Sequence, residues 1–335
     1  MLKKLLYLVY YYKELDKKKF QKFFNYVVDN HNIPRVNLWK DILTSSLKHN
    51  ISLLDFFYFK FYERNEDDRK KWAGTGYLYE YQLKTNPKDE REILENKLLF
   101  LEQYSKFINH NYSSKDVFLK NKDVADQLLS NRNNKLVLKS SDGQCGVGIE
   151  ILDLKKNQND WINEKIMNTE NDLIEEFITQ HDDLMNLSPS GLNTIRIFTQ
   201  LNKQNKVDIL GCRLRITINS TVDNLAAGNI AAPINEKTGL VYSPGVYSDI
   251  TKSVEEFHPV TGIKIVGFQI PYWKESLQMV KEAALLHPQN RSIGWDVAIT
   301  NDGPELLEGN HNWCKLLWQL PVKKGLKQNL VKYLL

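Results

Sequence analysis

The first part of the chain shows apolar residues at helical spacing. Over residues 1–30 they recur at roughly every third or fourth position: Leu5, Leu8, Tyr12, Leu15, Phe20, Phe23, Phe24 and Val27. This spacing predicts one amphipathic helix, which Pro34 ends. A second helical stretch covers residues 39–61 and closes in the charged run 63–71. Residues 73–76 then break the pattern, and residues 90–109 resume a helix.

From residue 135 the pattern changes to short β-type runs separated by turn residues. We predict strands at 136–139, 149–152, 172–177, 193–201, 207–217, 292–300 and 305–309. A helix fits residues 273–287, because Leu277, Val280, Ala284 and Leu285 fall on one side of it. Strands interleaved with helices and hairpins indicate an α+β fold.

Composition adds an asymmetry and excludes some classes. The 335 residues carry 45 Lys and Arg against 41 Asp and Glu, and 20 of the 37 aromatic residues lie in the first 100 positions. This diffuse charge is not typical of a nucleic-acid binder. No apolar run approaches the roughly 20 residues of a membrane span. Three widely separated cysteines (Cys145, Cys212, Cys314) favour a reducing, cytoplasmic setting.

The first motif is a strand that ends in lysine and runs into a glycine-rich loop. Lys139 closes the strand, and Gly143, Gly146 and Gly148 follow it. Glycines let backbone N–H groups approach phosphate oxygens closely, and a lysine beside them supplies positive charge. A glycine-rich hairpin turn without ligand is an equal alternative.

The second motif is a hairpin that carries acids. A three-residue loop at 301–303 would pair position 300 with 304, and therefore Asp296 with Glu308, with Asn310 on the same face. Two carboxylates and an amide oxygen suit Mg²⁺ that bridges nucleotide phosphates. The alternative is a solvated hairpin with ordinary surface acids.

The third motif is a cluster of arginines on a predicted hairpin. Arg213 and Arg215 share one strand face, and the register brings Arg196 near Arg213. Such a cluster repels itself unless an anion lies between its members. Structural ion pairs to Asp208 or Glu176 are an equal alternative. A fourth segment, 173–180, is an apolar strand that ends in two acids, Glu175 and Glu176, and means little alone.

Together and in this order, the motifs resemble the ATP-grasp superfamily, and most closely its sugar-transfer associated family. The resemblance covers roughly residues 95–322. The segments that carry it are 95–99, 137–143, 174–181, 192–196, 262–273 and 294–310. The sequence departs from the pattern at Asn96, where an aspartate is usual, and after Asn310, where His-Asn-Trp replaces a Ser/Pro-Gly turn.

The resemblance implies a fold in which two α+β subdomains clamp ATP, here behind a mainly helical N-terminal domain. The implied domains are 1–92 (helical, rich in aromatics), 93–178 (small subdomain with the phosphate loop) and 179–335 (large subdomain with the Mg²⁺ site). Three roles stay open for the N-terminal domain. In order of preference they are packing on the catalytic body, sugar binding and peripheral membrane contact.

The resemblance also implies roles for individual residues. Phosphate contacts would come from Lys97 and Lys139 and from the loop that holds Ser140, Ser141, Gly143, Gly146 and Gly148. The adenine pocket would be lined by Glu175, Glu176, Phe177 and Ile178. Mg²⁺ would bind Asp296, Glu308 and Asn310. Catalytic arginines that steady the acyl phosphate or the acceptor would be Arg196, Arg213 and Arg215.

The function that the resemblance implies is an ATP- and Mg²⁺-dependent carboxylate–amine ligase working through an acyl phosphate. Its partners would be small molecules, such as a uronic acid or other sugar precursor and an amino acid, in the synthesis of capsular or surface polysaccharide. Two alternatives stay open: a kinase of the same fold that phosphorylates a sugar or an amide, and a nucleotide-binding protein without turnover.

Overall fold

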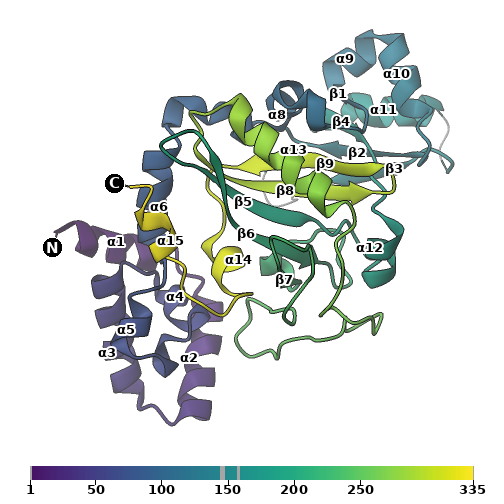
Figure 1. The fold of residues 1–335 in the computed structure, drawn as a ribbon. Helices are drawn as coiled ribbons and strands as arrows, with labels where there is room; N and C mark the ends of the chain where they lie inside the picture. Colours follow the sequence, from purple (N-terminus) through teal and green to yellow (C-terminus); the bar gives the residue numbers. More distant parts are fainter. Residues whose placement is uncertain (1, 144–147, 157–158, 335) are drawn as a thin grey trace.

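The computed structural model describes residues 2–143, 148–156 and 159–334. It contains a helical N-terminal region, a four-stranded sheet and a five-stranded sheet. In Figure 1 the five-stranded sheet lies in the centre, the N-terminal helices at the lower left and the four-stranded sheet at the upper right. No helix among the described residues is long and apolar enough to cross a membrane.

The N-terminal region is built from short helices rather than two long ones. Its helices are α1 (Leu2–Lys13), α2 (Lys17–His31), α3 (Arg35–His49), α4 (Leu53–Tyr58), α5 (Glu66–Arg69) and α6 (Thr75–Thr85), with the 3₁₀ turn η1 (Phe61–Glu63) before α5. The single helix predicted over residues 1–30 is therefore wrong. Asp16 begins a new helix because its side chain accepts the backbone N–H of Lys19, as an N-cap does.

The break divides the predicted apolar stripe into two parts. In the α2 part, the apolar side of the helix is buried, since Phe20, Phe23, Phe24 and Val27 are almost inaccessible to solvent. They pack with Phe56, Phe57, Phe59, Phe61 and Trp72 in an aromatic cluster. In the α1 part, Leu8 packs against this cluster, whereas Leu5 is 52% exposed and Tyr12 is 60% exposed.

Short helices connect this region to the first sheet. They are η2 (Lys88–Glu90), α7 (Glu92–Glu95), α8 (Lys97–Gln103) and η3 (Ser105–Phe107). The continuous helix predicted over 90–109 is therefore broken. One reason is Asn96, which ends α7 and whose side chain caps α8 by accepting the N–H of Leu99.

The four-stranded sheet is antiparallel, in the order β1-β4-β2-β3. Its strands are β1 (Tyr112–Ser114), β2 (Lys135–Lys139), β3 (Glu150–Asp153) and β4 (Leu173–Glu176). The helices α9 (Lys115–Lys120), α10 (Lys122–Leu129) and α11 (Asn159–Asn168) supply side chains to its apolar core. Sequence analysis missed β1 and these helices.

The five-stranded sheet is also antiparallel, in the order β7-β6-β5-β8-β9. Its strands are β5 (Ile195–Leu201), β6 (Val207–Ile216), β7 (Ile230–Ile234), β8 (Ser292–Thr300) and β9 (Gly303–Asn310). Sequence analysis missed β7. The remaining helices are α12 (Asp182–Leu187), η4 (Leu225–Ala227), α13 (Trp273–Leu286), α14 (Lys315–Gln319) and α15 (Gln328–Val331).

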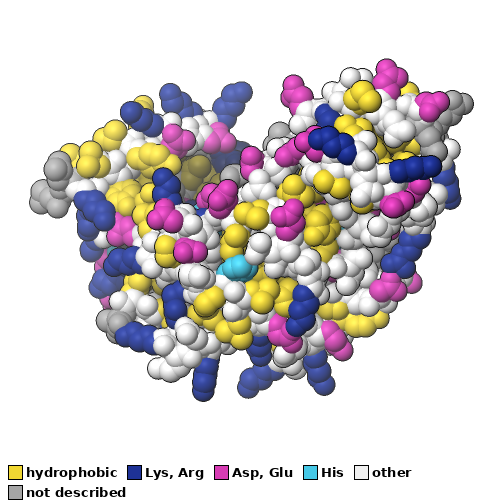
Figure 2. Space-filling view, turned by 90° about the horizontal axis from the view of Figure 1, so that it is seen from above, with side chains coloured by type: hydrophobic (Ala, Val, Ile, Leu, Met, Phe, Trp, Pro, Cys, Tyr) yellow, Lys and Arg dark blue, Asp and Glu magenta, His cyan; other side chains and the backbone are white. Residues whose placement is uncertain are grey.

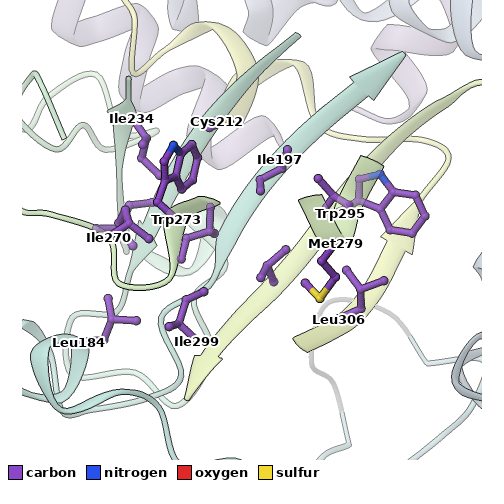
Figure 3. Close-up of a cluster of buried hydrophobic side chains, with 14 of the residues drawn as sticks. Leu184, Ile197, Cys212, Ile234, Ile270, Trp273, Met279, Trp295, Ile299 and Leu306 are labelled. Carbon is purple, nitrogen blue, oxygen red and sulfur yellow. The ribbon is translucent and has the colours of Figure 1, made fainter. Parts of the chain in front are cut away.

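Both faces of the five-stranded sheet are covered. One face packs against α13, where Trp273 and Met279 meet sheet residues such as Ile197 and Trp295 (Figure 3). Because side chains alternate along a strand, Arg196 and Asp296 point to the opposite face. That face therefore carries buried charged side chains next to apolar ones such as Phe198.

The N-terminal helices pack against the C-terminal part of the chain. Ala73, Leu78 and Tyr81 join a buried cluster with Trp313 and Trp318. Ala73 also exchanges two backbone hydrogen bonds with the Gln319 side chain, at 2.9 and 3.0 Å. The N-terminal region is thus part of the packed body, the role ranked first for it.

Candidate active site

The site is built around two acids on neighbouring strands. Asp296 of β8 and Glu308 of β9 are directly opposed Cα partners. Asp296 is buried and Glu308 is half-buried, and their carboxyl groups lie close enough to interact. Asn310 lies beside them, since its Nδ2 donates to Glu308 Oε1 at 3.1 Å. The structure therefore brings together the three side chains predicted as metal ligands.

The turn of the β8–β9 hairpin differs from the one predicted, although Asp296 still pairs with Glu308. Thr300 pairs with Gly303, so the turn has two residues, not three. The register then shifts by one between Asp296 and Val297, which is a β-bulge. The bulge offsets the shorter turn, and Asp296 is again opposite Glu308.

Two arginines hold Asp296. Arg196 donates from Nε to one carboxylate oxygen and from Nη2 to the other, the latter at 2.8 Å. Arg215 donates to the second oxygen, also at 2.8 Å. Burial would raise the pKa of Asp296, but the two guanidinium groups outweigh it and hold the pKa well below its usual range.

Glu308 has the opposite electrostatic environment. Burial raises the pKa of Glu308, and the neighbouring charge of Asp296 raises it further. The acid pair consequently holds one firmly ionised member and one that protonates readily. Arg215 is also anchored by Asp223, whose Oδ1 lies 2.6 Å from its Nη2.

Arg213 lies apart from this cluster. It is the Cα partner of Arg196, as predicted, but its guanidinium donates to the carbonyls of Trp318 and Cys212. The ion pairs with Asp208 or Glu176 that were the alternative prediction for the arginines are not formed in the described part of the chain. Asp208 accepts from the Tyr333 hydroxyl at 2.6 Å, and Glu176 accepts from Asn111 at 3.1 Å.

A second group of charges comes from the four-stranded sheet. Lys139, at the end of β2, forms a buried ion pair with Glu175 of β4. Lys97, at the start of α8, donates from Nζ to the carbonyls of Ser140 and Gly143. The Lys97 backbone N–H also donates to the Ser141 carbonyl at 2.8 Å. Lys97 therefore holds the first part of the glycine-rich loop.

The loop is fixed on its other side by Asp172, which accepts the Ser141 N–H at 2.7 Å and the Ser141 hydroxyl at 2.6 Å. Asn96 donates to Asp142 at 2.9 Å. An aspartate at position 96 would face Asp142 with like charge, so the asparagine suits this contact. Gly148 adopts φ +76°, which favours glycine, and Gly146 lies outside the described residues.

Lys97 links the two groups of charges. Burial lowers the pKa of Lys97, and so does the neighbouring charge of Lys139, while Glu308 and Glu175 oppose the change. These influences come from both sheets. Lys97 therefore lies within electrostatic reach of Lys139 and of Glu308 in the acid pair.

A cavity of about 290 Å³ lies beside the end of β4. Glu176, Phe177 and Ile178 line it on one side, and Asn301 and Asp302 of the β8–β9 turn line it on the other. Glu175, predicted to line a pocket here, does not; its side chain is buried against Lys139. The Phe177 carbonyl accepts from Asn133 at 2.6 Å.

Comparison with known proteins identifies the family. The model of the sugar-transfer associated ATP-grasp family matches residues 78–333. The chain belongs to this family. As an ATP-grasp protein it falls in a group of ATP-dependent ligases, and its α+β fold agrees with that assignment. No curated protein sequence matches the chain.

Several solved structures resemble the chain at low sequence identity. The ligase PsnB with a minimal precursor is 11% identical, with a TM-score of 0.44 over 75% of this chain and 62% of that chain. An N5-carboxyaminoimidazole ribonucleotide synthetase in complex with ADP is 11% identical, with a TM-score of 0.39 over 65% and 45%. A D-alanyl-alanine synthetase A from Vibrio cholerae is 14% identical, with a TM-score of 0.40 over 72% and 66%. The chain thus spans less than two thirds of the first two proteins.

Two further residues that line the cavity, His110 and Glu305, were not predicted from the sequence. His110 lies between Glu305 and Glu175, with its ring nitrogens 2.7 and 3.2 Å from their carboxylate oxygens. Burial would lower the pKa of His110, but the two acids outweigh it and raise it to about 9. Burial would raise the pKa of Glu175, and Lys139 and His110 instead lower it to about 2.

The partners of His110 lie 65 and 195 positions away in the chain, so no local pattern could have revealed the contact. Three other polar residues near the motifs have structural partners. His181 caps α12, the His258 ring contacts the Thr217 carbonyl at 2.8 Å, and Asp249 pairs with Lys22 at 2.6 Å.

The residues of the acid pair fit a Mg²⁺ ion that is shared with phosphates. The described residues contain no cluster of three or more His, Cys, Asp or Glu side chains arranged for a metal. Magnesium in nucleotide sites commonly takes only one or two protein carboxylates, and phosphate oxygens and waters complete its shell. Glu308 and Asn310 supply oxygens of the right kind beside Asp296, while the arginines hold Asp296 in place.

Proposed function

We propose that this ATP-grasp protein is a carboxylate–amine ligase that uses Mg·ATP and acts on small molecules of surface-polysaccharide synthesis. The observation that carries the proposal is the meeting of two charge groups. Lys97 and Lys139 come from the side of the four-stranded sheet, and Asp296, Glu308 and Arg215 come from the five-stranded sheet. A triphosphate between them would meet cations at one end and metal-binding oxygens at the other.

In this proposal each residue group has a defined task. Lys97 and Lys139 would bind phosphate oxygens. The cavity at Phe177 and Ile178 would take the base. In the structure Lys139 pairs with Glu175, and Lys97 donates to loop carbonyls. Phosphate oxygens would therefore compete with Glu175 and with these carbonyls for the two ammonium groups.

Asp296, Glu308 and Asn310 would hold Mg²⁺, which would neutralise charge on the transferred phosphoryl group. Arg196 and Arg215 would orient Asp296 and place positive charge next to the reacting oxygens. No protein nucleophile is required, because positioning and charge stabilisation carry phosphoryl transfer. Arg213 would support β6 from the side of Trp318 and take no direct part.

The reaction would proceed in two balanced steps. A carboxylate oxygen attacks the γ-phosphorus, so that an acyl phosphate forms and ADP leaves. An amine then attacks the carbonyl carbon, an amide forms, and inorganic phosphate leaves with the oxygen that joined the two groups. The amine loses one proton in this step. A uronic acid or another sugar acid and an amino acid are substrates of the proposed class.

The experiment that tests the proposal is a screen for ADP formation with Mg·ATP against pools of carboxylates and amines. We expect ADP and free phosphate only when both pools are present. The double variant D296A/E308A should lose this activity, and E282Q on the exposed side of α13 is the matched control. Activity that survives in the double variant would refute the proposal, and phosphate retained on the product would favour the kinase instead.

A further inference from the structure

The outward surface of α1 is apolar, although α1 lies on the outside of the molecule. Its inward side carries Tyr11, which is buried and donates to Asn50 at 3.0 Å. On the outward side, Leu6 is 62% exposed and Val9 is 51% exposed. Residues 5–12 of α1 are apolar on every side of the helix, and such a stretch is normally covered all round. This one has no cover among the described residues.

A second apolar strip lies on α3. Val36, Trp39, Leu43 and Leu47 are spaced three or four residues apart and are all exposed, Val36 by 78%. Residues at this spacing share one face of a helix. The strip adjoins α1, because Lys4 Nζ donates to the Lys48 carbonyl at 3.5 Å. The outward side of α1 and this strip are called the N-terminal apolar face below.

Positive charge surrounds the N-terminal apolar face. Residues 1–50 carry ten Lys and Arg against four Asp and Glu. Lys13, Lys17, Lys18 and Lys40 make no ion pair with any described residue. Lys13 follows Val9 by one helical turn and so ends the outward side of α1. Figure 2 shows hydrophobic side chains on the left-hand lobe, with Lys and Arg as well as some Asp and Glu side chains near them.

We propose that the N-terminal apolar face docks this protein onto the surface of a membrane that contains anionic lipids. Apolar and aromatic side chains with lysines around them suit the boundary between acyl chains and anionic headgroups. Tyr10, Tyr12 and Trp39 are exposed residues of the kind that is enriched at that boundary. With 12 residues, α1 is too short to span a bilayer and would lie in the membrane plane.

Charge argues against a second copy of the chain as the occupant. In a twofold dimer the same surface meets itself, so the unpaired lysines of one copy would face those of the other. An anionic membrane offers the complementary charge instead. The proposal stands on this surface alone and does not depend on the proposed ligase activity.

The test is co-sedimentation of the full chain with vesicles of phosphatidylcholine alone or with about 30 mol% phosphatidylglycerol, which gives the vesicle surface a negative potential. We expect at least about tenfold stronger binding to the anionic vesicles, and weaker binding as salt rises. The double variant L6E/V9E should lose at least about tenfold in binding. K13E/K17E should lose the preference for anionic vesicles.

The matched control is L285E/L286E at the end of α13, where both side chains are also exposed. It should bind vesicles like the wild type. Unchanged circular dichroism and melting temperature of L6E/V9E would show that the variant is folded. Absence of wild-type binding to anionic vesicles, or binding that L6E/V9E leaves unchanged, would overturn the proposal. A lipid-free dimer that L6E/V9E dissociates would also overturn it and assign the face to a second copy.

Discussion

His110 forms a bridge to Glu305, with its Nδ1 2.7 Å from the Glu305 carboxylate, although 195 residues separate them in the chain. Its other ring nitrogen lies 3.2 Å from Glu175, the acid that pairs with Lys139. A buried line of alternating charge therefore runs from β9 through His110 to the end of β2. It connects the five-stranded sheet to the phosphate-loop lysine.

The first prediction concerns pH and stability. Because the folded protein raises the pKa of His110 from 6.5 to about 9, the charged ring stabilises the fold fully below pH 6.5. This contribution, about 3 kcal/mol by linkage, should be lost as the pH rises through about 9. Urea unfolding of the wild type and H110Q should differ most at pH 6 and little above pH 9.5. H31Q, at the half-buried C-terminal end of α2, is the control, and a pH-independent difference between wild type and H110Q would contradict the assignment.

The second prediction separates the arginines. Arg215 holds Asp296 and Asp223, so R215K should lower turnover about 100-fold, as loss of one preorganised charge contact does. Arg213 donates to the Trp318 carbonyl, so R213K should lower the melting temperature and leave turnover per folded molecule nearly unchanged. Steady-state kinetics and thermal melts on both variants test the distinction. If R213K lowered turnover as much as R215K, Arg213 would also take part in catalysis.

The third prediction concerns nucleotide binding. K97M and K139M should each weaken ATP binding by at least about tenfold in calorimetry, because each removes a charge aimed at phosphate. Since burial and Lys139 lower the pKa of Lys97, wild-type affinity should fall as alkaline pH removes its proton, earlier than for an ordinary lysine. K106M, which removes an exposed ion pair with Glu282 and a contact with the Phe107 ring, is the control. Unchanged affinity in K97M would exclude its phosphate role.

The fourth prediction concerns the N-terminal region. Gln82 donates to the Trp313 carbonyl at 2.9 Å, and Asn86 donates to the carbonyls of Ser292 and His311 at 2.8 Å. Removal of residues 1–86 would expose Trp313 and Trp318, so the truncated chain should aggregate in size-exclusion chromatography. A monomeric truncated chain with full activity would show that these contacts are dispensable.

The sequence was informative where chemistry is local. Strands β2, β4, β5, β6 and β8 were predicted within about two residues at either end, since each has its own apolar run. The Asp296–Glu308 pairing was also predicted, but through a three-residue loop that does not exist. A periodic pattern cannot show where a bulge inserts an extra residue, and here the bulge compensated for the shorter turn.

Long-range contacts explain most of what was missed. The partners of His110 and the direction taken by Arg213 depend on which segments meet in space. The N-terminal stripe failed for a local reason, since Asp16 divides it and leaves Leu5 and Tyr12 exposed. The roles of the site residues stay predictions, although the structure brings Lys97, Lys139, Asp296 and Glu308 into one region.

The most direct test of the account follows the oxygen of the carboxylate. The wild-type chain is incubated with Mg·ATP, an amine pool and carboxylates labelled with ¹⁸O, and the released phosphate is analysed by mass spectrometry. The account predicts one ¹⁸O atom in the phosphate for each amide formed, because the acyl phosphate oxygen leaves with phosphorus. Unlabelled phosphate, or label that stays in a stable phosphorylated product, would contradict the ligase mechanism.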